Sequence, residues 1–247
     1  MSDQTIILLA LGAISGGFIN GLTGTGTALF SLGFYLLALA PLQAVAIVAL
    51  MSVLAGLQGL WVVRAAIRSN LRRLARFLLP ALIGVPLGVG LLASIDAGSL
   101  RLAIATLLIV HGAYFGFRTT LPRFHKRTPM VDGVIGFFGG IAGGAASVSG
   151  AIPALWLSLR PWPKAEVRAV LQPFNVVVLG MTVGLLFLQG AYDERAVHAL
   201  LITIPIGFVA AQAGIFVFRR IQDTTFRRLL IGLSLLMGIG ISLQELF

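Results

Sequence analysis

The sequence predicts an all-α, polytopic membrane protein built from two inverted repeats of about four hydrophobic segments each. Hydrophobic residues make up 58% of the 247 residues and charged residues only 11%, whereas a soluble domain carries about 25% charged residues. The apolar residues form long runs separated by short basic segments. The first segment of each half is interrupted by glycines, which predicts a re-entrant or discontinuous helix in both halves.

Composition also narrows the classes of function. The net charge is +10 and the mean hydropathy is +1.00, but Lys and Arg flank apolar runs, as membrane-orienting charges do. We therefore expect a lipid bilayer as partner and no nucleic acid. Cysteines are absent, the three histidines are scattered, and there is no phosphate-binding loop or catalytic grouping. The chain is thus expected to be no enzyme and to hold no metal or cofactor.

The apolar stretches number eight, and we expect all of residues 1–247 to form a single transmembrane domain. They are 5–40, 42–63, 77–95, 100–117, 133–159, 169–191, 196–218 and 229–247. As one helix, the first would run about 54 Å, against a hydrocarbon core of about 30 Å. It is interrupted between Asn20 and Thr27, and the fifth between Gly139 and Gly150. Whether these two are re-entrant hairpins or full spans is left open.

The two interrupted stretches align when the sequence is compared with itself at an offset of 123 residues. The shift pairs Gly16-Gly17 with Gly139-Gly140, Gly21 with Gly144, Ser52 with Asn175, and Gly84 with Gly207. A shift of 126 pairs Ser99-Leu100-Arg101 with Thr225-Phe226-Arg227. We therefore expect an internal duplication, with repeats 1–118 and 129–247. Other glycines, such as Gly84 and Gly88, are expected to serve close helix packing.

Basic residues distinguish between two topologies. If all eight stretches cross once, Lys and Arg divide 10 against 8 between the sides, which sets no orientation. If the first and fifth stretches are hairpins, 16 gather in loops on one side and only Arg101 and Arg195 face the other. That asymmetry satisfies the positive-inside rule. It predicts three crossings per half, inverted repeats, and both termini outside the cytoplasm.

Irregular backbone at membrane depth is tolerated only inside protein or beside a wet cavity, so the interruptions predict the substrate site. A helix begins after Thr27 and another after Gly150, and helix starts attract anions. Nearby hydroxyls and amides add hydrogen bonds. The predicted substrate-binding residues are Asn20, Thr23, Gly24, Thr25, Gly26, Thr27, Ser52, Ser147, Ser149, Gly150, Arg168, Gln172 and Asn175. The alternative is that the glycines only pack helices.

Two further residues have competing interpretations. Arg168 lies near the start of the sixth stretch, where it either extends to the membrane surface or attracts an anion. His111 is a candidate proton relay, although a lone histidine is more often structural. No carboxylate lies deep in a stretch, so coupling through a buried acid has no candidate.

The glycine runs resemble those of a known family. Glycines recur from Gly12 to Gly26, a second run extends from Gly136 to Pro153, and Lys164-x-Glu-x-Arg168-Ala169 enters the sixth stretch. Together these resemble the sulfite exporter TauE/SafE family over nearly the whole chain. The first half reads Thr25-Gly26-Thr27 where the family typically has consecutive glycines, so the particular anion stays open.

The resemblance implies transport of sulfite, a sulfonate such as sulfoacetate, or a related organic anion across the bacterial inner membrane. The leading hypothesis is a secondary transporter, in the direction of export, that binds its anion at the two glycine-rich interruptions. A passive anion channel and a non-transporting membrane subunit are the alternatives. The coupling ion and the presence of a homodimer are left open.

Overall fold

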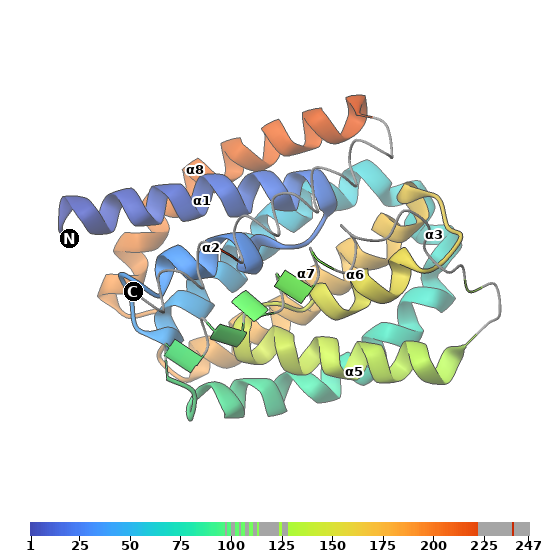
Figure 1. Ribbon diagram of the computed structural model, residues 1–247, viewed down its shortest axis with the longest axis horizontal. Helices are drawn as coiled ribbons and strands as arrows, with labels where there is room; N and C mark the ends of the chain where they lie inside the picture. The colour runs from blue at the N-terminus through green and yellow to red at the C-terminus, as the bar shows by residue number, and fades with distance from the viewer. Residues whose placement is uncertain are drawn as a thin grey trace.

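The computed structural model describes residues 1–96, 98–99, 102–103, 105–106, 109–110, 113, 124, 128–221 and 239, and there all regular structure is helical (Figure 1). Six helical segments in these ranges have the length and apolar composition of membrane spans. The predicted class, an all-helical polytopic membrane protein, is confirmed. The helices are α1 (Asp3–Thr23), α2 (Thr27–Tyr35), α3 (Pro41–Leu92), α5 (Pro129–Ala146), α6 (Ala151–Ser158), α7 (Lys164–Leu188) and α8 (Glu194–Arg220).

Local signals set most helix ends. Ser2 caps α1, since its Oγ accepts a hydrogen bond from the Thr5 N–H (3.3 Å), and Asp193 caps α8 through the Ala196 N–H (2.9 Å). Such side-chain caps satisfy N–H groups that have no partner within the helix. At its other end α1 stops at Gly24, whose φ of 86° is left-handed. Glycine adopts this conformation at no steric cost, so it terminates helices.

Helix α3 corrects one expectation. Residues 42–63 and 77–95 were expected as separate stretches joined by an arginine-containing loop, but the connection is helical. Figure 1 shows α3 running to the right, bending, and returning to the left. Its two span-length parts are Pro41–Trp61 and Val63–Leu92. The segment 64–76 contains only Arg, Ala, Ile, Leu, Ser and Asn, and without glycine or proline nothing in it interrupts a helix.

Two helical hairpins enter the molecule from opposite ends (Figure 1). In the first, α2 packs antiparallel on α1, and Ser31 Oγ donates to the Gly12 carbonyl (2.7 Å). In the second, α6 returns along α5, and Trp156 Nε1 donates to Asp132 Oδ1 (2.8 Å). The long arms α1 and α5 have the length of a span, whereas α2 and α6, with 9 and 8 residues, reach only about 13 Å. Each hairpin therefore turns within the protein.

Each long arm packs backbone to backbone on one further span. Helix α1 packs on α8, where Gly17 meets Gly207 and Gly21 meets Ala211. Helix α5 packs on the second part of α3, where Gly140 meets Ala81 and Gly88 meets Ile141. Small residues allow helix backbones to approach this closely in membranes. The expected packing role of Gly84 and Gly88 agrees with these contacts. The packing of the α5 glycines on α3 also explains why α5 stays helical to Ala146, although we expected the interruption to begin at Gly139.

A substitution on α5 tests this packing. We expect Gly140→Ala to destabilise the protein, because its Cβ would overlap the Ala81 carbonyl of α3, and overpacking costs about 1–3 kcal/mol. Gly133→Ala is the matched control on the same helix, because its Cβ would meet Pro80 at an ordinary 3.6 Å. Thermal unfolding of the purified variants measures the difference. Equal melting temperatures for both variants would contradict the close α3–α5 contact.

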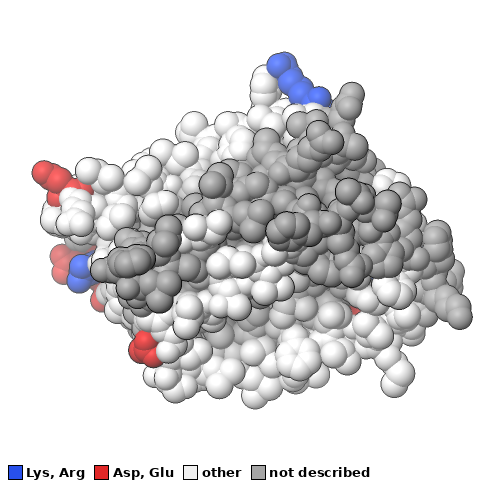
Figure 2. Space-filling model, viewed as in Figure 1, with Lys and Arg blue, Asp and Glu red and all other residues white. Residues whose placement is uncertain are grey.

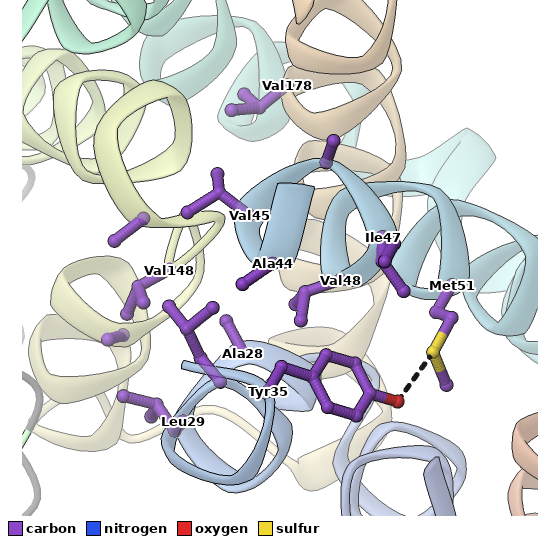
Figure 3. Close-up of a cluster of buried hydrophobic side chains, with 14 of the residues drawn as sticks. Ala28, Leu29, Tyr35, Ala44, Val45, Ile47, Val48, Met51, Val148 and Val178 are labelled. Atoms are coloured by element: carbon purple, nitrogen blue, oxygen red, sulfur yellow. Dashed lines mark hydrogen bonds between the residues drawn. The ribbon is translucent and has the colours of Figure 1, made fainter. Parts of the chain in front are cut away.

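Buried apolar side chains fill the space between α2, the start of α3 and the turn of the second hairpin (Figure 3). Tyr35 lies in this core with no exposed surface, and its hydroxyl donates to the Met51 sulfur (3.1 Å). Val45 and Val48 of α3 are fully buried beside Val148. Because this core lies against both hairpins, it fixes their ends relative to α3.

Charged side chains divide between the two ends of the molecule. In Figure 2 acidic side chains gather at the left with basic atoms among them, and basic side-chain atoms project at the top of the molecule. At the left end Gln43 donates to Asp193 (2.6 Å). The opposite end, called here the basic end, holds the bend of α3, the starts of α5 and α7, and the end of α8 with Arg219 and Arg220. Between the ends the described surface is mostly uncharged, as a lipid-facing surface must be.

Candidate functional site

The turns of the two hairpins touch each other and helix α7. Gly150 lies directly against the Thr25 side chain, leaving no room for a Cβ atom. Both turns reach the same amide, because Asn175 Oδ1 accepts a hydrogen bond from Ser149 Oγ (2.6 Å) and one from Thr25 Oγ1 (3.4 Å). Asn175 is 2% exposed. Residues distant in sequence thus form one buried polar cluster.

A second cluster lies where α2 begins. Asn20 is fully buried, and its Nδ2 donates to Thr27 Oγ1 (2.6 Å) and to the Ser52 carbonyl (3.4 Å). Neither α2 nor α6 has a side-chain cap at its start. The first N–H groups of a helix have no partner within it, so these starts offer donors close to the polar side chains.

The third cluster surrounds Arg168, which is 2% exposed. Its guanidinium donates to the Gly21 carbonyl (2.9 Å) and the Leu22 carbonyl (3.4 Å) at the end of α1. It also donates to Gln172 Oε1 (3.1 Å) and lies 4.2 Å from the centre of the Phe218 ring. All these partners are neutral. No carboxylate among the described residues lies within ion-pair distance of this charge.

Several buried polar atoms in these clusters have no hydrogen-bond partner among the described residues. They are Asn20 Oδ1, Ser52 Oγ and Asn175 Nδ2. If either asparagine amide were turned over, its other atom would be left unpaired instead, so one unpaired group persists in both orientations. Buried polar groups normally have partners because leaving them unpaired costs about 1–3 kcal/mol. Unpaired atoms at the meeting point of two turns are therefore available to a ligand.

Other predicted residues shape the turns. Thr23 Oγ1 donates to the Thr25 carbonyl, and Gly26 has a φ of 95°, which only glycine adopts readily. Ser147 Oγ donates to the Val45 carbonyl (2.9 Å) and so faces α3. Gly24 packs against Arg168 and Gln172. The candidate proton relay, His111, lies outside the described residues.

The sequence interpretation missed three residues around Gln172 and Arg168. Gln172 Nε2 donates to the Gly56 carbonyl (3.0 Å), and Gly59 has no room for a side chain because Gln172 fills the space. Phe218 covers the Arg168 guanidinium. The two glycines lie three residues apart on one face of α3, a spacing that marks a close neighbour. No local pattern marks Phe218.

A small cavity lies beside the second cluster. It has a volume of about 10 Å³ and lies between α1, α2, α3 and α8, lined by residues that include Gly17, Thr27, Met51, Ile204 and Gly207. This volume is at the lower limit for one water molecule. A ligand of several heavy atoms requires the surrounding helices to separate.

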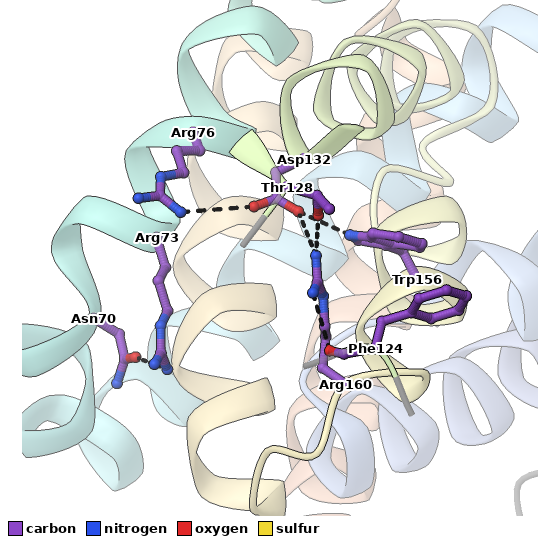
Figure 4. Close-up of polar contacts among 8 residues, drawn as sticks. All are labelled: Asn70, Arg73, Arg76, Phe124, Thr128, Asp132, Trp156 and Arg160. Atoms are coloured by element: carbon purple, nitrogen blue, oxygen red, sulfur yellow. Dashed lines mark hydrogen bonds and ion pairs between the residues drawn. The ribbon is translucent and has the colours of Figure 1, made fainter. Parts of the chain in front are cut away.

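A charged network ties the second hairpin to the basic end (Figure 4). Asp132 is 5% exposed and pairs with Arg160 (3.4 Å) and Arg76 (3.9 Å). Arg160 also donates to Thr128 Oγ1 and lies 4.7 Å from the centre of the Trp156 ring. Nearby, Arg73 pairs with Glu166 (2.6 Å). These contacts connect α3, α5, α6 and α7 on one side of the hairpin turns.

Comparison with known proteins gives one family. The family model described as "Sulfite exporter TauE/SafE" matches residues 8–241. No curated protein matches the chain. The matched range includes both hairpin turns, all three polar clusters and the charged network.

Proposed function

The chain belongs to the sulfite exporter TauE/SafE family, and from this premise we propose that it is a secondary transporter of a small anion bound where the hairpin turns meet. The observation that carries the proposal is the set of buried, unpaired polar atoms on Asn20, Ser52 and Asn175, in a protein that also buries the Arg168 guanidinium among neutral partners at the end of α1. Of these atoms, Asn175 Nδ2 and the Ser52 hydroxyl can donate hydrogen bonds, and donors together with a buried positive charge suit an oxyanion.

Secondary transport by this chain is supported by an inverted repeat, and the inverted repeat is in turn supported by packing contacts between the helices. Three contacts between α1 and α8 have counterparts between α5 and α3 in the same register. Gly17–Gly207 corresponds to Gly140–Ala81, Gly21–Ala211 to Gly144–Val85, and Gly214–Phe18 to Gly88–Ile141. The shifts are 123 residues for the hairpin arm and 126 for its partner. The predicted pairing of Gly84 with Gly207 is therefore displaced by three residues, close to one helical turn.

The repeat suggests how access alternates. In transporters with inverted repeats, one bundle rocks against the other around a fixed site near the midplane. Here the close glycine contacts make α1 with α8 one rigid pair, and α5 with α3 another. The pairs meet at the hairpin turns, so movement at that contact opens the site to one side or the other.

The proposed substrate and orientation rest on the family and on the distribution of charges. We propose sulfite, a sulfonate such as sulfoacetate, or a related organic anion as substrate, moved outward across the bacterial inner membrane. The basic end then faces the cytoplasm, in accord with the positive-inside rule, and the N-terminus faces outward. Outward movement of an anion is also favoured by a membrane potential that is negative inside.

Counterflow in proteoliposomes tests the proposal. Vesicles containing the purified chain and loaded with unlabelled sulfite, thiosulfate, sulfoacetate, taurine or acetate are placed in a trace of the same labelled compound. We expect transient accumulation of label above equilibrium for at least one anion, because a carrier exchanges bound substrate. Simple equilibration would indicate a passive channel instead. No flux above empty vesicles for any compound would favour the non-transporting subunit.

A further inference from the structure

The bend of α3 contains five arginines, which divide into two groups by their partners. Arg73 pairs with Glu166 (2.6 Å). Arg76 points towards the buried Asp132, 3.9 Å away (Figure 4). The other three, called here the arginine row, are exposed and pair with no carboxylate in the part of the chain that the structure describes; they are Arg64, Arg68 and Arg72. The row therefore holds three positive charges that the described protein does not neutralise.

Spacing along the helix places the arginine row on one face of α3. Its members are four residues apart, so successive Cα atoms are separated by about 6 Å along the helix axis and the side chains are neighbours. Like charges at this spacing destabilise a helix. Between Pro41 and Leu92, α3 contains no aspartate or glutamate that would offset the repulsion. An anion from outside the chain would remove it.

Exposed apolar side chains indicate the depth of the arginine row in the membrane. Trp61 is 70% exposed, and the Arg64 guanidinium lies 4.2 Å from the centre of the Trp61 ring. Tryptophan is enriched at the level of the lipid headgroups. Exposed leucines continue on both sides of the row, with Leu57 before it and Leu79 after it. Because the bend is helical throughout (Figure 1), no loop carries the row away from the bilayer, and its guanidinium groups lie at headgroup level.

We propose that the arginine row, together with Trp61, binds the phosphate of an anionic phospholipid such as phosphatidylglycerol, whose acyl chains lie along Leu57 and Leu79. A guanidinium presents a fork of donors that matches phosphate oxygens and supplies the opposite charge. A zwitterionic lipid brings its own cation, which the row repels. This site goes beyond transport, since it depends neither on the substrate nor on the direction of its movement.

The apolar neighbours of the row favour a lipid over other anionic partners. A soluble phosphate has no apolar part that would cover Trp61 and Leu57. An acidic protein would have to displace lipid from a surface at headgroup depth. A phospholipid satisfies both the charge of the row and the apolar surface beside it, because its phosphate and its acyl chains occupy these two levels of the bilayer.

Native mass spectrometry of the purified full-length protein in detergent tests the proposal. The protein is titrated with phosphatidylglycerol and, separately, with phosphatidylcholine that has the same acyl chains. We expect wild type to bind phosphatidylglycerol about tenfold more tightly, or more, because each arginine near an anionic surface contributes about fivefold. Arg68→Gln, at the centre of the row, is expected to weaken phosphatidylglycerol binding about fivefold, and replacement of all three arginines by glutamine about a hundredfold.

Arg195→Gln is the matched control. Arg195 is also exposed, and its removal changes the net charge equally, but it lies at the start of α8, at the end opposite the row. Because a distant charge is screened, Arg195→Gln is expected to leave phosphatidylglycerol binding within about twofold of wild type. Size-exclusion profiles of all variants verify that they are folded.

Equal affinities of wild type for the two lipids would overturn the proposal, and this result needs no variant. An unchanged affinity in the folded triple variant would overturn it as well. Glycerol 3-phosphate, added in equal amount, tests the source of the phosphate, because its displacement of the lipid would assign the row to a soluble phosphate instead. An acidic protein that copurifies with wild type and is lost from the triple variant would likewise replace the lipid as partner.

Discussion

Gly150→Ala is expected to reduce anion flux strongly while the protein still folds. A Cβ at this position would overlap the Oγ1, Cβ and Cγ2 atoms of Thr25 in the opposite hairpin turn. The backbone itself accepts alanine, because φ at Gly150 is −84°. The effect therefore reports the contact between the turns and not local strain. Separating them by this overlap costs about 1–3 kcal/mol, which corresponds to about 5- to 150-fold in an equilibrium between states.

Counterflow per amount of folded protein measures this loss. A second substitution provides the control. Thr25→Ala removes Oγ1 and Cγ2 from the overlap and leaves Cβ, so the double variant Gly150→Ala/Thr25→Ala is expected to recover part of the flux that Gly150→Ala loses. Recovery beyond the product of the single effects identifies the two residues as one contact. Flux at the wild-type level in Gly150→Ala would show that transport does not require the turns to touch.

Asp132→Asn is expected to produce the largest loss of stability. Asp132 is buried, pairs with Arg160 and Arg76, and accepts a hydrogen bond from Trp156 Nε1. Asparagine keeps the shape and an acceptor oxygen but removes the negative charge. The Arg160 side chain, 4% exposed, then loses its charged partner Asp132. Removing one partner of a buried ion pair costs about 3–5 kcal/mol.

Glu166→Gln is the matched control for Asp132→Asn, because it breaks the ion pair with Arg73 at the same end of the molecule. Both side chains of that pair are more than a third exposed (39% and 37%), and exposed pairs contribute about 0–1 kcal/mol. Thermal unfolding and the yield of monodisperse protein are the measurements. A melting temperature for Asp132→Asn as close to wild type as that of Glu166→Gln would contradict the buried network.

The sequence predicted the class of protein, an all-helical polytopic membrane protein, because hydropathy depends on local composition. It was wrong about the connection 64–76, which is part of helix α3. Clustered arginines were interpreted as a loop because they mark a membrane boundary, but a helix can bend at that boundary without unwinding. It also placed the second interruption too early, since the glycines of α5 up to Gly144 pack against α3 and remain helical.

Sequence alone therefore determined that the chain is a membrane protein with apolar spans and that glycines and hydroxyls gather at two places. Hydropathy and glycine content are properties of short segments, so no tertiary information was needed. Tertiary structure decided which polar groups meet. Thr25 reaches Asn175 across 150 residues, Ser147 faces Val45, and Arg168 contacts the end of α1. Such pairings depend on how the hairpins and α7 pack together. The sequence of one segment does not predict which distant segment it will contact.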